Sequence, residues 1–360
     1  MKILHILYTA RAEGTVKLAL DWLQEGGHHQ EVLVLSPDTP DLAEALKRGA
    51  AWLGQPGAMP SGLAKFPWIV FQVWRTCRER RPDLLVCWPN GFSPWVLSGA
   101  RLAGTRRLIT HAGNPPDWHL KGRLQTLAST GVAWVSGGRT VCCSQYVAGE
   151  FARSPGAFAS VLRTVPNCAP IDRIREEAQA ARGEPPSGRA RFIMVATLER
   201  HKDHATLLKA MPEVLMKCPA AELWLAGDGS ERARLEALSA DLGLTGSVTF
   251  LGSRSDVPAL LGQSDVFVFS TTVREGLGTV LVEALAAGVP IVATDVPACR
   301  ELLCGGTWGA LVRANDPSAL ASAMIESLAH TRIQASEDRT AYLRKFTPGR
   351  MIAGYIEAAS

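Results

Sequence analysis

The feature that most constrains the fold of this chain is an alternation of short apolar runs with longer amphipathic segments. Apolar runs rich in Val, Ile and Leu, separated by segments with helical periodicity, predict βα units around a parallel sheet. The first such runs are ILHILY, EVLVLS, DLLVCW, RRLITH and RTVCCS. We therefore predict an α/β protein with doubly wound sheets.

The alternation occurs twice in the 360 residues. A second series starts with RFIMVATL and continues through AELWLAGDG, SVTFLG, DVFVFST, PIVATDV and GALVR. The segment between the two series is charged and contains Gly and Pro, which is typical of an exposed connection. We predict an N-terminal domain over residues 1–170, a linker over 171–190 and a C-terminal domain over 191–344. The final helix, 345–360, is expected to pack back on the first domain.

Charge and cysteine usage narrow the class of protein. The net charge of +4, from 38 basic and 34 acidic side chains, is too small to indicate nucleic-acid binding. The densest basic stretch, RTCRERRPD, has its arginines at the end of a predicted helix, where cations favour the helix dipole. The eight cysteines form no Cys-x-x-Cys pair and show no zinc spacing, so we expect reduced core residues and no metal site.

The predicted cellular location rests on two features that the sequence does not show, a signal-peptide cleavage site and a membrane-spanning run. The N-terminal run KILHILYTA has no small-residue cleavage site, and no run approaches the roughly 20 apolar residues of a spanning helix. We expect a cytoplasmic protein. Peripheral contact with a membrane stays open, because Trp118 and Trp134 lie near Lys121 and Arg123 in one segment. The helical spacing of Trp68, Phe71 and Trp74 more often indicates core packing.

The stretch REGLGTVLVEALAAGVPIVATD carries the candidate chemistry. A helix is predicted to begin after Gly276-Leu277-Gly278 and to end at Gly288, with Pro290 preventing its continuation. The free N–H groups of a helix N-terminus favour an anion such as a diphosphate. Glu275 precedes this turn and Glu283 lies within the helix, so two acceptors flank the predicted phosphate site and suit the hydroxyls of two sugars. Either glutamate could instead be bound by protein groups.

The region from Val195 to Leu303 resembles family 4 glycosyltransferases, which have the GT-B fold. The resemblance rests on KDHATLLKA, LAGDGSERARLEAL, VTFLGSRSDVPALL and EGLGTVLVEALAAGVPIVATDV. The N-terminal half is similar through TVCCSQYV and TVPNCAPID. The resemblance implies two Rossmann-like domains that face a central cleft.

The resemblance also implies roles for individual residues. Glu283 would accept hydrogen bonds from the ribose hydroxyls, and Glu275 would hold a hydroxyl of the transferred sugar. Lys202 would neutralise the departing nucleotide, and His111 would contact the donor sugar. The diphosphate would be cradled by the backbone of Gly276, Leu277, Gly278, Thr279 and Val280. Gly14 would be one glycine of a pair near the donor and the acceptor, and Arg254 is a candidate for contact with the base. Lys202 could instead be a solvated lysine, and His111 a bonded structural residue.

Three departures from the family pattern affect these roles. Ala196-Thr197-Leu198 replaces Gly-Arg-Leu, so one expected cation is missing and Arg200 is the candidate to replace it. The N-terminal glycine pair is reduced to Glu13-Gly14, and Pro166-Asn167-Cys168 lacks the usual glycine.

The resemblance implies a retaining hexosyltransferase that uses a nucleotide-sugar, with UDP as the expected nucleotide. The acceptor would be a glycan or a lipid-linked glycan in polysaccharide or glycolipid biosynthesis, bound mainly by the N-terminal domain. No Asp-x-Asp occurs, so no metal or other cofactor is expected. Alternatives are a sugar phosphorylase, a nucleotide-sugar epimerase or a non-catalytic binding subunit. A Rossmann dehydrogenase is disfavoured, since YTARAEGT lacks the spaced glycines of a dinucleotide turn.

Overall fold

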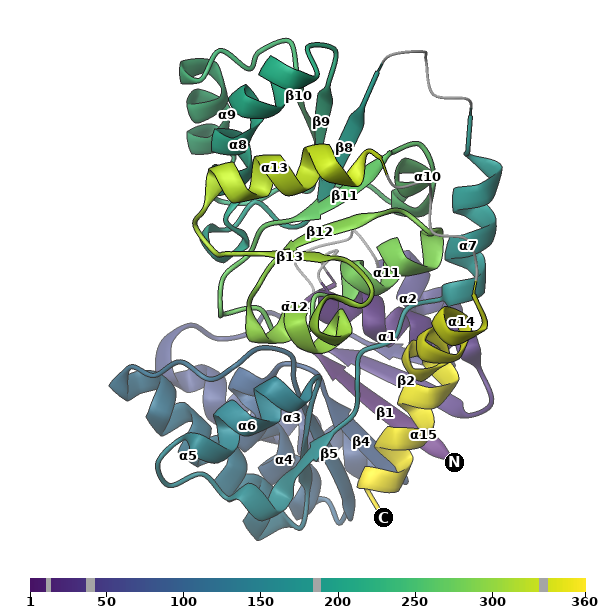
Figure 1. Cartoon of the computed structure of the whole chain (residues 1–360). Coiled ribbons are helices and arrows are strands. Elements are labelled where there is room, and N and C mark those ends of the chain that lie inside the picture. Colours follow the sequence, from purple (N-terminus) through teal and green to yellow (C-terminus); the bar gives the residue numbers. More distant parts are fainter. Residues whose placement is uncertain (11–13, 37–42, 184–188, 330–335) are drawn as a thin grey trace. The chain divides into compact units, whose positions relative to one another are not determined.

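The computed structural model describes residues 1–10, 14–36, 43–183, 189–329 and 336–360, and the chain divides into two compact units (Figure 1). The first unit comprises residues 1–169 and 347–360, and the second comprises residues 170–346. Glu13, half of the reduced glycine pair, lies outside the described residues.

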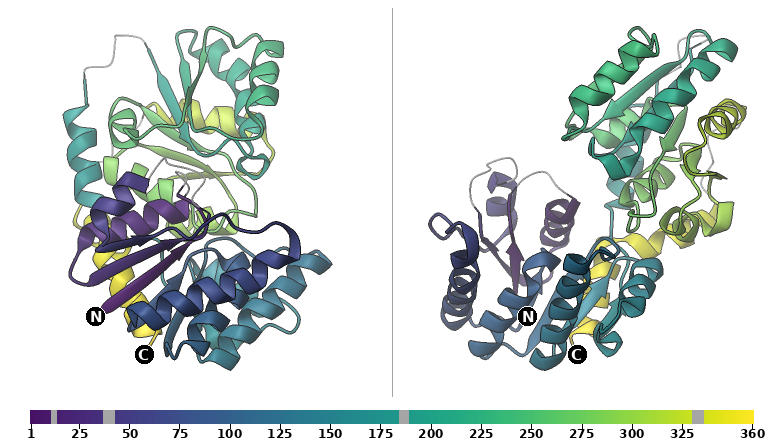
Figure 2. Two further views of the ribbon diagram at one scale, coloured as in Figure 1. Left: turned by 180° about the vertical axis from the view of Figure 1, so that it is seen from behind. Right: turned by 90° about the vertical axis from the view of Figure 1, so that its left-hand side faces the viewer.

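The first unit is built on a seven-stranded parallel sheet in the order β3-β2-β1-β4-β5-β6-β7. Its strands are β1 (Lys2–Leu7), β2 (His29–Val34), β3 (Trp52–Gly54), β4 (Leu84–Cys87), β5 (Arg107–Ala112), β6 (Arg139–Cys142) and β7 (Leu162–Thr164). Its helices are α1 (Gly14–Glu25), α2 (Ala43–Gly49), α3 (Lys65–Arg80), α4 (Ser93–Leu102), α5 (Leu120–Ser136), α6 (Gln145–Arg153) and α15 (Pro348–Ala358), with short 3₁₀ turns η1 (Gly62–Ala64), η2 (Asn90–Phe92) and η3 (Ala159–Val161). Helices cover both faces of this sheet (Figure 2).

The second unit has a six-stranded parallel sheet in the order β10-β9-β8-β11-β12-β13. Its strands are β8 (Arg191–Val195), β9 (Glu222–Ala226), β10 (Val248–Gly252), β11 (Val266–Phe269), β12 (Ile291–Thr294) and β13 (Ala310–Val312). Its helices are α7 (Ile171–Ala180), α8 (His204–Lys217), α9 (Arg232–Asp241), α10 (Val257–Gly262), α11 (Thr279–Ala287), α12 (Pro297–Leu302), α13 (Pro317–Ser327) and α14 (Glu337–Leu343), with 3₁₀ turns η4 (Arg200–Lys202), η5 (Cys304–Gly306) and η6 (Arg344–Phe346).

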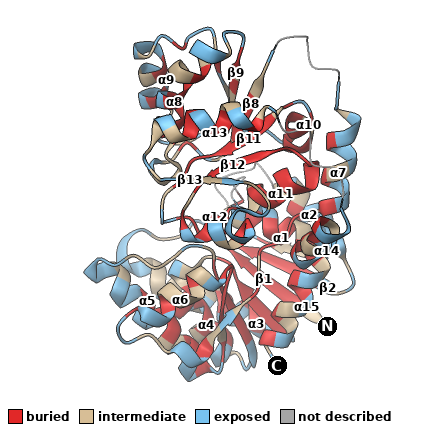
Figure 3. Cartoon of the chain, viewed as in Figure 1, coloured by how far each residue is buried: buried red, intermediate tan, exposed pale blue. Residues whose placement is uncertain are grey.

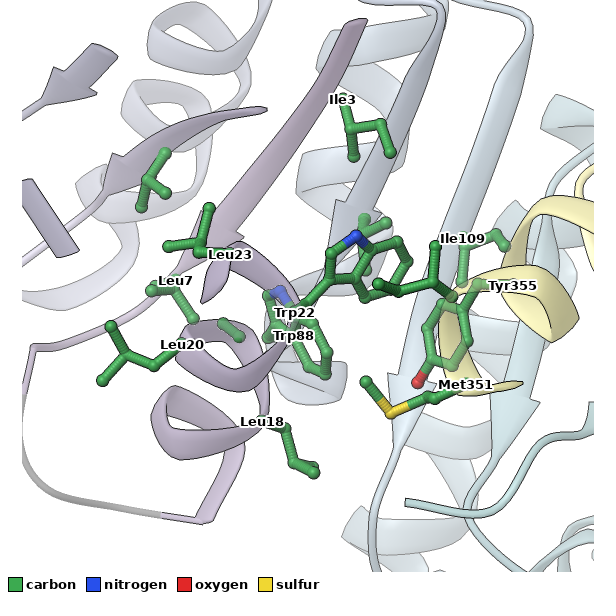
Figure 4. Close-up of a cluster of buried hydrophobic side chains, with 14 of the residues drawn as sticks. Ile3, Leu7, Leu18, Leu20, Trp22, Leu23, Trp88, Ile109, Met351 and Tyr355 are labelled. Carbon is green, nitrogen blue, oxygen red and sulfur yellow. The ribbon is translucent and has the colours of Figure 1, made fainter. Parts of the chain in front are cut away.

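The strands are parallel, and those in the middle of each sheet are buried because helices cover both faces, which is what the apolar runs predict. In the first unit, one core cluster joins α1, β1 and β4 to the C-terminal helix α15 (Figures 3 and 4). Tyr355 of α15 is fully buried, and its ring centroid lies 5.1 Å from that of Trp22 and 6.0 Å from that of Trp88. Helix α15 therefore belongs to the core of the first unit.

Two local expectations differ from the structure. Residues 171–180, which we expected to belong to an exposed linker, form α7, because Ile171, Ile174 and Ala178 share one helical face that is buried in the second unit. On α3, Phe71 and Trp74 are 50% and 37% exposed, so these two aromatics are not core residues, whereas Trp68 is half-buried and packs against the core as expected. The buried face of α3 consists of Ile69, Val73, Thr76 and Cys77.

Candidate functional site

The candidate site lies where the chain changes direction across the second sheet. Strands β8, β9 and β10 follow one another outward on one side, whereas β11, β12 and β13 follow outward on the other. In such sheets, ligands bind at the carboxyl ends of the two strands that flank the change of direction. Those strands are β8 and β11, and the segments that leave them are residues 196–203 and 270–278.

Hydrogen bonds tie these two segments together. The His201 carbonyl accepts from the Thr272 N–H and from the hydroxyls of Thr271 and Thr272, each at 3.1 Å. The Ser270 hydroxyl donates to the carbonyl of Asp203 at 3.0 Å. Since the segments are fixed to each other on both sides of Lys202, that lysine is held over the start of the β11–α11 loop.

The buried carboxylate of Glu275 accepts hydrogen bonds from three N–H donors and lies near one hydroxyl group. Its Oε2 lies 2.5 Å from Lys202 Nζ and 3.4 Å from the Thr271 hydroxyl. Its Oε1 accepts from the N–H groups of Gly276 at 3.2 Å and Gly278 at 3.1 Å. A carboxylate offers about four lone-pair sites. Three of them are filled by N–H groups, and a sugar hydroxyl would compete with the Thr271 hydroxyl, which also donates to the His201 carbonyl, for the fourth. The contact of Glu275 with the transferred sugar stays a prediction.

The charge of Glu275 is set by opposing effects. Burial would raise the pKa of its carboxyl group. The Lys202 charge and hydrogen bond, the nearby His201 ring and the Gly276 N–H outweigh burial, so the pKa is lowered. The His201 imidazole has a lowered pKa because of burial and the neighbouring Lys202 charge. At neutral pH the site thus holds an ionised Glu275 against a lysine ammonium.

Helix α11 begins in a conformation that requires glycine. Gly278 precedes it in the left-handed region, with φ 74°, and a Cβ there would lie 3.1 Å from Leu281 Cδ1 and 3.2 Å from Phe269 Cε1. Gly288, also at φ 74°, ends the helix, which confirms the predicted cap. The helix dipole and Lys202 favour an anion at this turn, but the N–H groups of Gly276 and Gly278 already donate to Glu275. A diphosphate would have to share or replace these bonds, so its binding by the backbone of Gly276 to Val280 stays a prediction.

Helix α11 is accessible along one strip only. Of its nine residues, Thr279, Val280 and Glu283 are half-buried and the other six are buried. At about 100° per residue, these three positions lie on one face. Glu283 thus lies between the buried Val282 and Ala284 but on the strip that the core leaves uncovered.

Two other cations of the second unit, Arg200 and Arg254, are candidates for contact with the donor. Arg200 is exposed and has no ion-pair partner among the described residues, and Thr197, where the expected arginine is missing, is also exposed. Arg254 is exposed and donates to both carboxylate oxygens of Asp256, Nε at 2.8 Å and Nη2 at 2.5 Å. Base contact by Arg254 stays a prediction and would compete with this ion pair.

His111 and Gly14 belong to the first unit. His111 is 1% exposed, and its Nδ1 lies 2.8 Å from the Tyr355 hydroxyl. Burial lowers its pKa to about 4, and its Nε2 has no hydrogen-bond partner among the described residues. Gly14 begins α1, and a Cβ there would meet no described atom within 4 Å. Their contacts with a donor stay predictions.

Sequence reasoning missed the hydroxyl cluster that supports the site. Ser270, Thr271 and Thr272 follow directly on the apolar strand β11, and all three donate to carbonyls of the segment after β8. Three successive hydroxyl side chains after a fully buried strand are the signal that could have indicated a polar strand end. Their partners lie about 70 residues earlier and carry no sequence mark.

The chain is similar to a known family model and to several glycosyltransferases. Residues 175–345 match the family model described as "Glycosyl transferases group 1". A "GDP-mannose-dependent alpha-(1-6)-phosphatidylinositol monomannoside mannosyltransferase" of Mycolicibacterium smegmatis is 29% identical over 71% of this chain and 70% of its own length. The "Lipopolysaccharide core biosynthesis glycosyltransferase LpsE" of Rhizobium meliloti is 30% identical over 48% of this chain and 49% of its own length. The chain thus spans about half the length of LpsE.

Solved structures show the fold. Anabaena Alr3699/HepE, in complex with UDP-glucose, superposes with a TM-score of 0.85 at 20% identity, over 99% of this chain and 98% of that one. WaaG, described as "a glycosyltransferase involved in lipopolysaccharide biosynthesis", has a TM-score of 0.65 at 17% identity, over 99% and 98% of the two chains. The fold is GT-B, and the family match together with the relatives supports a glycosyltransferase enzyme of the hexosyltransferase type.

None of the described helices combines the length and the apolarity needed to cross a bilayer. Among the described residues, no group of three or more His, Cys, Asp or Glu side chains is arranged to hold a metal ion.

Proposed function

We propose that the chain transfers a sugar, with retention of configuration, from a nucleotide-sugar to a glycan or lipid-linked acceptor. The observation that carries this proposal is the Lys202–Glu275 ion pair beside the N-terminus of α11, with Glu283 on the accessible strip of the same helix. This arrangement offers a cation and a helix N-terminus for a diphosphate, and a carboxylate for ribose hydroxyls one helical turn further on.

Lys202 is the residue that we assign to the departing diphosphate. Negative charge on that group grows as the sugar leaves, and a preorganised cation stabilises it without further reorganisation. Glu275 and the hydroxyl cluster hold the lysine in place, so the ammonium does not have to be ordered during the reaction. In the retaining mechanism that the resemblance implies, the departing phosphate helps to deprotonate the acceptor.

The nucleotide is proposed to be UDP. Support comes from the similarity of the fold to a protein solved with UDP-glucose, whereas the M. smegmatis relative is named for GDP-mannose. Titration calorimetry of the full chain with UDP and with GDP decides between them. Preference for GDP would overturn the UDP assignment and leave the phosphate site intact.

The acceptor is proposed to be lipid-linked, with the protein in peripheral contact with the cytoplasmic face of a membrane. The relatives are named for phosphatidylinositol mannosides and for the lipopolysaccharide core, both of which are glycolipids. We further propose that no metal is required, since Lys202 and the α11 N-terminus supply positive charge. Activity that vanishes with a chelator and returns with magnesium or manganese would contradict this point.

Product analysis with a labelled donor tests the reaction itself. A transferase yields a labelled acceptor whose anomeric configuration matches that of the donor. Label recovered only as a sugar phosphate in the presence of inorganic phosphate would indicate a phosphorylase, and a converted nucleotide-sugar would indicate an epimerase. Binding of the donor without any product over acceptor extracts would indicate a non-catalytic subunit.

A further inference from the structure

Helix α5 in the first unit has an unusual distribution of side chains. Its buried face consists of small and mostly polar residues, namely Thr126, Ser129, Thr130, Ala133 and Ser136. Their hydroxyls donate to carbonyls of the same helix, as from Thr126 to Gly122 at 3.0 Å and from Thr130 to Thr126 at 2.8 Å. Because the helix satisfies these hydroxyls itself, this face can be buried at little cost.

The large apolar side chains of α5 point to solvent instead. Leu120 is 72% exposed, Leu124 56%, Leu127 39%, Trp134 56% and Val135 76%. At about 100° per residue these five positions fall within one face of the helix, opposite the buried one. We name this set of five residues the α5 stripe. Figure 3 colours the exposed residues of this helix pale blue.

All charged side chains of α5 are basic. Lys121 and Arg123 are exposed and, by helical geometry, flank the stripe on its two sides. The helix sequence LKGRLQTLASTGVAWVS contains no Asp or Glu. Asp117, just before the helix, accepts a hydrogen bond from the His119 N–H and is partly exposed.

Tryptophans lie at both ends of the stripe. Trp118, two residues before α5, is 51% exposed, and Trp134 in its last turn stacks on Phe158 with ring centroids 5.2 Å apart. Indole rings are favoured at the boundary between lipid headgroups and acyl chains. An apolar helix face with flanking cations and terminal indoles is the pattern of a helix that lies in a membrane interface.

We propose that the α5 stripe is the surface through which the first unit docks on an anionic lipid bilayer. The proposal rests on the peripheral membrane contact suggested under the proposed function and assigns it to one helix. Lys121 and Arg123 would contact lipid phosphates, while the leucines and indoles would enter the boundary of the acyl region. The charge pattern favours anionic lipid over a second copy of the chain, because two α5 helices would bring like cations together.

Co-sedimentation of the full chain with phosphatidylcholine vesicles, with and without phosphatidylglycerol, tests the proposal. We expect binding to the anionic vesicles that weakens with salt. Leu124→Ser/Trp134→Ser should reduce the partition coefficient by about tenfold or more. Lys121→Gln and Arg123→Gln should each reduce it by about fivefold. The matched control is Met216→Ser in the second unit, which removes a side chain that is 75% exposed and should leave binding unchanged.

Three results would overturn the proposal. They are no binding of the wild type to anionic vesicles at low salt, equal binding by Leu124→Ser/Trp134→Ser, and a wild-type dimer that the same variant converts to a monomer. Calorimetry of each variant with UDP separates this proposal from the donor site. Loss of vesicle binding with unchanged UDP affinity concerns the α5 stripe alone, whereas absence of UDP binding in a vesicle-bound wild type concerns the donor site alone.

Discussion

The two units share a doubly wound topology but carry different chemistry where their sheets change direction. In the second unit, the segments after β8 and β11 are joined by an ion pair and by hydroxyl groups. In the first unit, the corresponding strands are β1 and β4. They are followed by aromatic residues, and the rings of Tyr8 and Phe92 stack with centroids 4.9 Å apart and an interplanar angle of 12°.

The difference extends to the residues beneath each strand end. The first unit buries His5 and His111 as part of an aromatic cluster with Trp22, Trp88 and Tyr355. Trp88 Nε1 donates to His5 Nδ1 at 3.2 Å, and His5 Nε2 lies 3.1 Å from Gln30 Oε1. The same topology thus presents a charged polar site in one unit and ring faces in the other. Topology fixes where a ligand can bind, and the side chains after the strands determine which chemistry binds it.

Acid should destabilise the first unit more than the second. Burial lowers the pKa of His5 and of His111 from 6.5 to about 4, and that of His204 in the second unit likewise. A lowered pKa means that each histidine is neutral in the fold. Its contribution to stability is complete above pH 6.5 and is lost as the pH falls from 6.5 to 4. Each should contribute about 3 kcal/mol over that range.

Hydrogen exchange, corrected for intrinsic rates and measured at pH 7 and at pH 4.5, can compare the two units directly. The pKa falls to about 4 for two histidines of the first unit and for one of the second, where the half-buried His201 adds a lowered pKa of its own. The core strands β1 and β4 should therefore lose more protection than β8 and β11. Equal losses, or earlier opening of the second unit, would contradict the comparison. His5→Gln should flatten the pH dependence in the first unit alone.

The parts predicted from sequence were those fixed by local chemistry. The α11 helix and its end at Gly288 follow from periodicity and from a glycine that readily adopts positive φ. The Lys202–Glu275 ion pair joins residues 73 positions apart, so no local pattern could show that each would be the partner of the other. Helix α7 was missed because its charged positions outnumber the three that it buries. The solvent side of α3 was missed because spacing identifies a shared face but does not show which way it points.

Replacing Lys202 tests whether turnover and the stability of the second unit depend on its positive charge. Lys202→Ala should lower turnover on the order of a hundredfold, since a lost charge-stabilising group acts mainly in the transition state. It should also destabilise the fold, because Glu275 is left buried without its cation. The double variant Lys202→Ala/Glu275→Gln removes that unpaired charge. Steady-state kinetics and urea unfolding should therefore show restored stability without restored turnover. Restored turnover would mean that Lys202 has only a structural role.

A smaller effect is expected when Glu283, on the accessible strip of α11, is replaced. Glu283→Ala should weaken UDP binding by about 1.5 to 3 kcal/mol, the range for a hydrogen bond to a charged group. Glu283→Gln should be milder, because one acceptor oxygen remains. Calorimetry gives the affinities, and Glu176→Ala on the exposed side of α7 is the matched control. Unchanged affinity in Glu283→Ala would remove the ribose assignment.

The smallest effect concerns the cation that the sequence lacks at Thr197. Arg200 is exposed, so a phosphate contact from it would act through well-solvated surroundings and be worth at most about 1 kcal/mol. Arg200→Ala should therefore lower turnover about fivefold, far less than Lys202→Ala. If both positions reach the same phosphate, Thr197→Arg in the Arg200→Ala background should recover part of that loss. Steady-state kinetics of the single and double variants decide the matter. An Arg200→Ala variant with wild-type turnover would leave Lys202 and the α11 N-terminus as the only positive groups that we assign to the diphosphate.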